Sequence, residues 1–210
     1  MTEVASKRQH WVELFATILL AAAALGTAWS TYQSTRWRGE QAVSTSKATA
    51  ARIESSEAAT RAGQLTQIDI ATFVQWTDAH ATGDDELEQF YRRRFRPEFQ
   101  PAFDAWLVTK PFTNPDAPLT PFAMPEYRVS ESVRSSDLNA QAEQHANDAE
   151  TDNQRADNYV LGVVMLAAAL FFAGISTKLR EERQREALLV LGWIIFLGTA
   201  IWLATSPVSV

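Results

Sequence analysis

Two uncharged apolar stretches decide the fold of this chain: YVLGVVMLAAALFFAGIST at residues 159–177 and ALLVLGWIIFLGTAIWLAT at residues 187–205. Each has close to the ~20 apolar residues that cross a bilayer as a helix. A helix is required because the hydrocarbon core contains no water to bond backbone amides. Buried helices of a soluble protein are the alternative, but uncharged runs of this length are typical of membrane spans. We therefore expect two closely spaced transmembrane helices.

A third apolar stretch, WVELFATILLAAAALGTAWSTY, occupies residues 11–32, with Glu13 as its one charge. Lys7 and Arg8 precede it, so it also resembles a cleavable signal peptide. We interpret it as an uncleaved anchor. The predicted fold class is an all-α membrane protein with three transmembrane helices.

Basic residues beside the spans give the predicted orientation, because short cytoplasmic loops are enriched in Lys and Arg. Residues 1–10 and the loop 178–186 lie on one side and carry Lys7, Arg8, Lys178, Arg180, Arg183 and Arg185. The other side has four basic residues near the membrane, and they are spread over a long domain: Arg36, Arg38, Lys47 and Arg155. We therefore place 1–10 and 178–186 in the cytoplasm, and 33–158 and the tail 206–210 outside it.

The extramembrane domain, residues 33–158, is predicted to be mostly helical. No proline and only two glycines occur between residues 33 and 80, so one continuous helix from about Lys7 to His80 is expected. Gly83 suits the end of that helix, and Asp84 or the residue after it suits the N-cap of the next. Five prolines between residues 110 and 128 exclude a regular helix and predict an extended loop.

Small residues at heptad-like spacing mark both predicted long helices. The first stripe is Ala48, Ala51, Ser55, Ala58, Ala62 and Leu65, and the second is Ala142, Ala146, Ala149, Asn153, Ala156 and Val160. Such stripes let two helices approach closely. Because the second stripe runs into the span 159–177, we predict a long antiparallel helical domain.

Aromatic residues gather at the far end of this domain. Leu87, Tyr91, Phe95, Phe99, Phe103 and Leu107 recur every four residues. We regard Phe95, Phe99, Phe103 and Trp106 as a candidate interaction surface or ligand pocket. The alternative is that this apolar face forms the core of a small domain.

The stretch FRPEFQPAFDAWLVTKPFTNPDAPLTPFAMPEYR, residues 95–128, resembles an uncharacterised family of bacterial membrane proteins. That family also has one N-terminal span, a helical extramembrane domain and a C-terminal pair of spans. The resemblance implies a bacterial inner membrane and supplies no functional residues.

The sequence contains no recognisable catalytic set. The absence of cysteine excludes disulfides, thiol nucleophiles and Cys-based zinc sites. His10, His80 and His145 lie in no metal-ligand spacing, and no phosphate-binding loop or nucleophile elbow is present. A net charge of −6 argues against nucleic-acid binding. We therefore predict no enzymatic activity, no metal and no cofactor.

Two charged features are candidate sites. Glu13 is the only ionisable residue in a predicted span, which makes it a functional candidate, but it can also pair with arginines of the loop 178–186. The densest basic run is Arg92, Arg93, Arg94 and Arg96. This run is either a patch for anionic lipid or another acidic partner, or a solvated helix end balanced by acids.

Three function classes fit these features. The leading hypothesis is a non-enzymatic membrane scaffold or accessory subunit, which assembles through its spans and helical domain into a homo-oligomer or a larger membrane complex. The lipid bilayer is then a partner and nucleic acid is not. The alternatives are an extracytoplasmic ligand sensor that uses the aromatic cluster, and an oligomeric channel or transporter component with Glu13 near a pore mouth.

Overall fold

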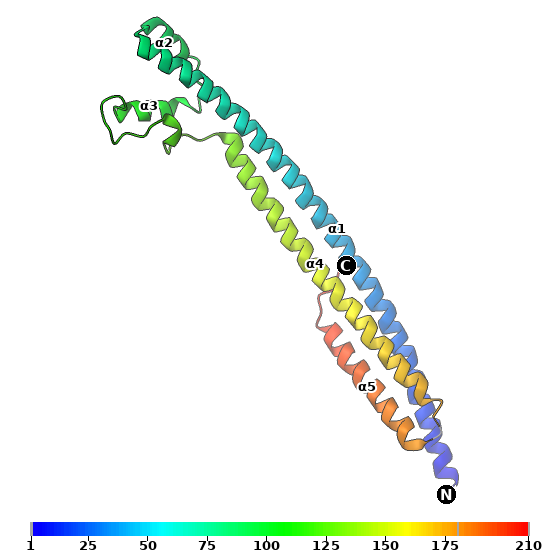
Figure 1. Cartoon of the computed structure of the whole chain (residues 1–210). Helices are drawn as coiled ribbons and strands as arrows, with labels where there is room; N and C mark the ends of the chain where they lie inside the picture. Colours follow the sequence, from blue (N-terminus) through cyan, green and yellow to red (C-terminus); the bar gives the residue numbers. More distant parts are fainter. Residues whose placement is uncertain (1, 180, 210) are drawn as a thin grey trace. The chain divides into compact units, whose positions relative to one another are not determined.

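The chain is all-helical over the residues that the computed structural model describes, which are 2–179 and 181–209, without the side chains of residues 2–9. Its elements are α1 (Thr2–Thr82), α2 (Asp85–Arg92), α3 (Gln100–Val108), the 3₁₀ helix η1 (Pro121–Ala123), α4 (Ser130–Ser176) and α5 (Glu182–Ala204) (Figure 1). Among the basic residues used for the predicted orientation, Arg180 and the side chains of Lys7 and Arg8 lie outside this description.

Three of the helices, α1, α4 and α5, are long and apolar enough to cross a membrane. The predicted all-α fold with three candidate spans is confirmed at this level. In the most apolar window of each helix, only 17%, 33% and 17% of the residues are buried within the chain. Most of these apolar surfaces are therefore left for lipid or for another protein to cover.

The chain divides into two compact units. Unit 1 comprises Met1–Ser46 and Ala146–Val210, and unit 2 comprises Lys47–His145. Helices α1 and α4 each contribute residues to both units, whereas α5 belongs to unit 1.

Close helix packing in unit 1 depends on small residues. Ala16, Leu19, Ala173 and Leu189 form a buried cluster from α1, α4 and α5. A Cβ atom added to Gly192 of α5 would lie 3.1 Å from the Leu19 side chain and 3.4 Å from the backbone oxygen of Ala169. Helix α5 therefore packs directly against both other helices, and Figure 1 shows it beside α4.

The breaks in unit 2 follow local chain chemistry. Helix α1 ends before Gly83, whose φ of +70° suits a residue without a Cβ atom. The Asp84 side chain then accepts a hydrogen bond from the Leu87 amide and caps α2. Pro101 lies in the first turn of α3, where its missing amide hydrogen breaks no helical bond. In the proline-rich segment 110–128, the only helix is the short 3₁₀ helix η1, and the rest consists of turns and extended chain.

The α1 and α4 portions of unit 2 meet through small side chains. Ala58, Ala62 and Ala142 are buried there. The Ser55 hydroxyl donates to the backbone oxygen of Ser135 at 2.8 Å, which requires the two backbones to lie close together. These buried members of the two stripes therefore lie where helices pack, as heptad spacing predicts.

Candidate functional site

The four aromatic candidates lie in the core of unit 2. Phe95, Phe99, Phe103 and Trp106 are buried with Phe73 and Trp76 of α1 in one cluster. Phe95 and Phe103 meet edge to face at a centroid distance of 4.8 Å, a favourable aromatic geometry. The Trp106 indole N–H donates to the backbone oxygen of Pro118 at 2.7 Å, so its one polar atom is satisfied. A ligand at these side chains would have to displace their contacts with one another.

A buried polar network adjoins this core. The Asp69 side chain of α1 is 0% exposed and accepts a hydrogen bond from Arg96 Nε at 3.0 Å. Its second oxygen accepts one from the Tyr127 hydroxyl at 3.1 Å. Arg96 also pairs with Glu98 at 2.7 Å, and Glu98 accepts a bond from the Ser130 amide at the start of α4. The Asp69 carboxylate thus joins α1 to the segments at Arg96 and Tyr127, and Glu98 extends the network to the start of α4.

The network shifts the proton affinities of its members. The pKa of Glu98 is lowered, chiefly by hydrogen bonding from Ser130 and further by Arg96, against the opposing effect of burial. The pKa of Tyr127 is raised, chiefly by burial and further by the Asp69 carboxylate. Both shifts favour the charge pattern of the network: an ionised Glu98 and a protonated Tyr127.

The other three arginines of the predicted basic run have different partners. Arg92 pairs with Asp104 at 2.9 Å, and the two side chains are 53% and 58% exposed. Arg93 Nε donates to the backbone oxygen of Gln89. The Arg94 guanidinium lies 3.4 Å from the centre of the Phe90 ring. With Arg96 in the buried network, Arg92, Arg93 and Arg94 are the members of the run that remain exposed.

Glu13 lies against α5. Its carboxylate is 3.5 Å from Arg185 Nη2, and the Glu13 side chain is half-exposed, whereas that of Arg185 is mostly buried. Beside this pair, an apolar groove of about 510 Å³ is lined chiefly by Trp11, Phe15 and Trp193. An acid paired with an arginine is neutralised locally, which makes its place in an apolar helix tolerable.

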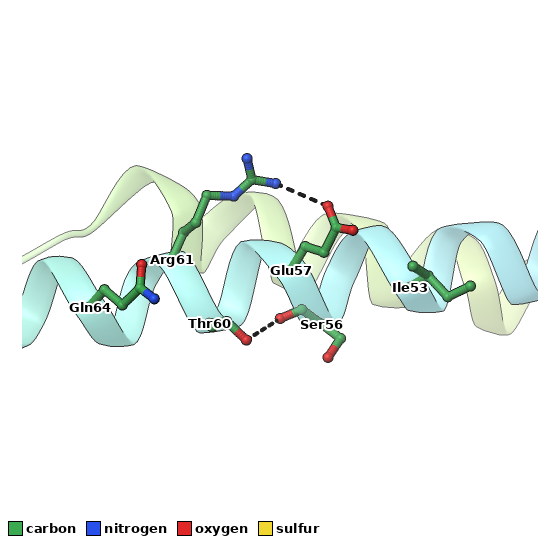
Figure 2. A pocket seen from close by; sticks show the side chains of 6 residues that line it. All are labelled: Ile53, Ser56, Glu57, Thr60, Arg61 and Gln64. Atoms are coloured by element: carbon green, nitrogen blue, oxygen red, sulfur yellow. Dashed lines mark hydrogen bonds and ion pairs between the residues drawn. The ribbon is translucent and has the colours of Figure 1, made fainter.

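A second groove, of about 410 Å³, lies on α1 in unit 2. Figure 2 shows its lining residues, which are Ile53, Ser56, Glu57, Thr60, Arg61 and Gln64. All come from one helix, and the dashed lines join Arg61 to Glu57 and Thr60 to Ser56. The Arg61–Glu57 pair is a salt bridge between residues four apart on an exposed helix face, and the Thr60 hydroxyl is bonded to the backbone of its own helix.

The segment after α5 is bound by buried polar side chains in unit 1. Gln33 of α1 pairs with the backbone of Ser209 in both directions, at 3.0 and 3.3 Å. The Trp37 indole and the Tyr159 hydroxyl both donate to the backbone oxygen of Pro207, at 3.2 and 3.0 Å. We call Gln33, Trp37 and Tyr159 the tail site.

Comparison with known proteins identifies no relative: no family model, curated protein or solved structure matches the chain. Over the described residues, no three His, Asp or Glu side chains are grouped so that they could hold a metal ion.

Sequence reasoning missed the two best-defined polar sites, Asp69 and the tail site. Asp69 had a signal: it lies seven residues after Ala62 and seven before Trp76, at an inward position of the heptad stripe where an acid requires a buried partner. Gln33 directly follows the first predicted span and carried no comparable signal.

Proposed function

We propose that this protein is a non-enzymatic integral membrane scaffold or accessory subunit, which assembles through its three spans and its helical domain. The observation that carries the proposal is the large apolar surface of α1, α4 and α5 that the chain itself leaves uncovered. In α5, Ile194 and Ile201 are 62% and 67% exposed. Monomeric soluble proteins rarely expose apolar patches on this scale.

The same proposal places residues 1–10 and 178–186 in the cytoplasm of a bacterial inner membrane, with 33–158 and the tail on the other side. The bias of basic residues toward the first two segments supports this orientation. The tail site supports one part of it. Pro207 bonds to Trp37 and Tyr159, which lie at the outer ends of two predicted spans, so the tail belongs with those ends.

We also propose that α1 and α4 run antiparallel in a long hairpin outside the membrane. Two contacts within unit 2 support this direction. Ser55 bonds to Ser135, and farther along α1, Arg61 lies 3.9 Å from Glu131, which is earlier in α4. Residue numbers therefore rise along one helix as they fall along the other.

Assembly between chains is supported by glycines that have no neighbour within the chain. A Cβ atom added to Gly174 or Gly198 would meet nothing within 4 Å. Gly198 lies on the exposed apolar face of α5, together with Leu191, Ile194 and Ile201. Small residues on an uncovered face of a span are typical of helix–helix interfaces in membranes.

The test is the oligomeric state of the purified protein in mild detergent and in lipid nanodiscs, measured by light scattering and native mass spectrometry. We expect a defined oligomer, or a stoichiometric co-purifying membrane protein. Gly198→Leu should weaken that assembly while leaving the stability of the isolated, monomeric chain nearly unchanged. A strict monomer with no partner in both environments would contradict the proposal.

A further inference from the structure

The tail site is the place in unit 1 where buried polar side chains converge on a non-helical stretch of backbone. Gln33, Trp37 and Tyr159 are 0%, 9% and 1% exposed. They come from two helices, α1 and α4, and their side chains form hydrogen bonds with the backbone of Pro207 and Ser209. The Arg155 guanidinium lies 4.6 Å from the centre of the Trp37 ring, on which it packs.

This geometry needs an occupant. A buried donor or acceptor without a partner costs about 1–3 kcal/mol, so these side chains need hydrogen-bond partners as long as the site is closed to water. The segment after α5 satisfies them with its own backbone. Ser209 contributes an N–H and a carbonyl oxygen to the Gln33 amide, as a neighbouring β-strand would.

The contacts at Pro207 and Ser209 indicate that the ligand is a peptide backbone. Trp N–H and Tyr O–H groups donate together to one backbone carbonyl, that of a proline. A proline restricts the backbone in advance, so a proline-containing segment loses less entropy on binding. Ser209 is bound through its backbone atoms and is buried, so this position requires a side chain small enough to fit.

We propose that Gln33, Trp37 and Tyr159 form a binding site for a short proline-containing peptide, and that the chain's own segment 206–209 is its occupant. The segment follows α5 directly, since α5 ends at Ala204. Occupancy therefore fixes the end of α5 against α1 and α4 within unit 1. The inference rests on contacts inside unit 1 and does not depend on assembly between chains.

Cysteine labelling tests occupancy in the full chain, which contains no cysteine of its own. Ser209→Cys and Val208→Cys are matched neighbours, because Ser209 is 8% exposed and Val208 is 51% exposed. In detergent, maleimide should label the Ser209→Cys chain roughly tenfold more slowly than the Val208→Cys chain, because the site must first open. Adding Gln33→Leu should remove that difference. Equal labelling rates without Gln33→Leu would overturn the proposal.

Peptide binding tests the site as a receptor. A variant truncated after Thr205 should bind a fluorescent Ser-Pro-Val-Ser-Val peptide saturably, as measured by anisotropy. Tyr159→Phe removes one donor and should weaken binding roughly three- to tenfold. Tyr32→Phe is the matched control, because Tyr32 is exposed on α1 and should leave affinity unchanged. No saturable binding, or equal effects of the two Tyr→Phe changes, would contradict a specific site.

Discussion

The side chain of Asp69 is fully buried in a part of α1 whose other inward residues are small or aromatic. A buried carboxylate is costly unless it is paired and hydrogen-bonded. Asp69 has both kinds of partner, Arg96 and Tyr127. Arg96 and Tyr127 lie in short turns between helices. The carboxylate therefore fixes the positions of these turns more specifically than apolar packing alone would.

Loss of this carboxylate should therefore be far more damaging than loss of an exposed one. We expect Asp69→Ala to lower the free energy of unfolding by about 2–4 kcal/mol, because Arg96 keeps Glu98 as a partner but Arg96 and Tyr127 each lose a hydrogen bond in a mostly buried place. Asp104→Ala removes the exposed partner of Arg92 and should cost about 1 kcal/mol or less. Denaturant unfolding followed by near-ultraviolet circular dichroism of the aromatic core measures both. Equal losses would contradict the role of Asp69.

Glu98 makes unit 2 sensitive to acid. Its pKa is lower in the folded chain than in the unfolded chain, chiefly because of Ser130. The ionised form therefore stabilises the fold above the ordinary carboxylate pKa of about 4.3, and this stabilisation is lost as the pH falls through the lower, folded value. We expect the melting temperature to decline on acidification below about pH 4.5 and Glu98→Gln to reduce that decline. The same decline of the melting temperature in the unchanged chain and in the Glu98→Gln variant would exclude Glu98 as its source.

At the scale of helices, two glycines of α5 differ in their surroundings. Gly192 faces Leu19 and the backbone of α4, whereas Gly198 has open space where a side chain would project. Gly192→Leu should cost about 1–3 kcal/mol, because the packed helices would have to separate. Gly198→Leu should leave the stability of the isolated chain within about 1 kcal/mol. Thermal melts in detergent compare them, and a Gly198→Leu loss as large as that of Gly192→Leu would contradict this packing.

Much of the helix layout was predictable, because it depends on local signals. The absence of proline before residue 97 allowed a continuous α1. A glycine with positive φ and an aspartate cap mark the break between α1 and α2. The stripe on α4 was predicted less accurately: Val160 was expected to face inward, but Tyr159 is buried instead. The buried position after Ala156 is three residues on and not the expected four, and Tyr159 there bonds to Pro207.

The two polar sites were harder to predict, because they join residues far apart in the sequence. The run at Arg92 to Arg96 resembles one basic patch as a sequence, but Arg96 pairs with Asp69 and separates from its neighbours. The tail site joins Gln33 to Ser209. Charge runs and periodicity report on neighbours along one element, so neither pattern could predict such pairs.

At the scale of the whole molecule, the average composition conceals three helices that are long and apolar enough to cross a membrane. Mean hydropathy is −0.18, a value ordinary for a soluble chain, because polar residues between the spans balance the apolar ones. The apolar residues are concentrated in α1, α4 and α5, where most remain uncovered. That distribution is the basis for the proposed three spans and for assembly around them.

Cysteine accessibility in intact bacterial cells tests the three-span topology most directly. Ser136 and Gln184 are suitable neutral, exposed positions, one in the predicted outer domain and one in the predicted cytoplasmic loop. The account predicts that an impermeant maleimide, given access to the outer face of the inner membrane, labels the Ser136→Cys chain in intact cells. It should label the Gln184→Cys chain only after the membrane is permeabilised. The reverse pattern, or equal labelling of both in intact cells, would contradict the proposed topology.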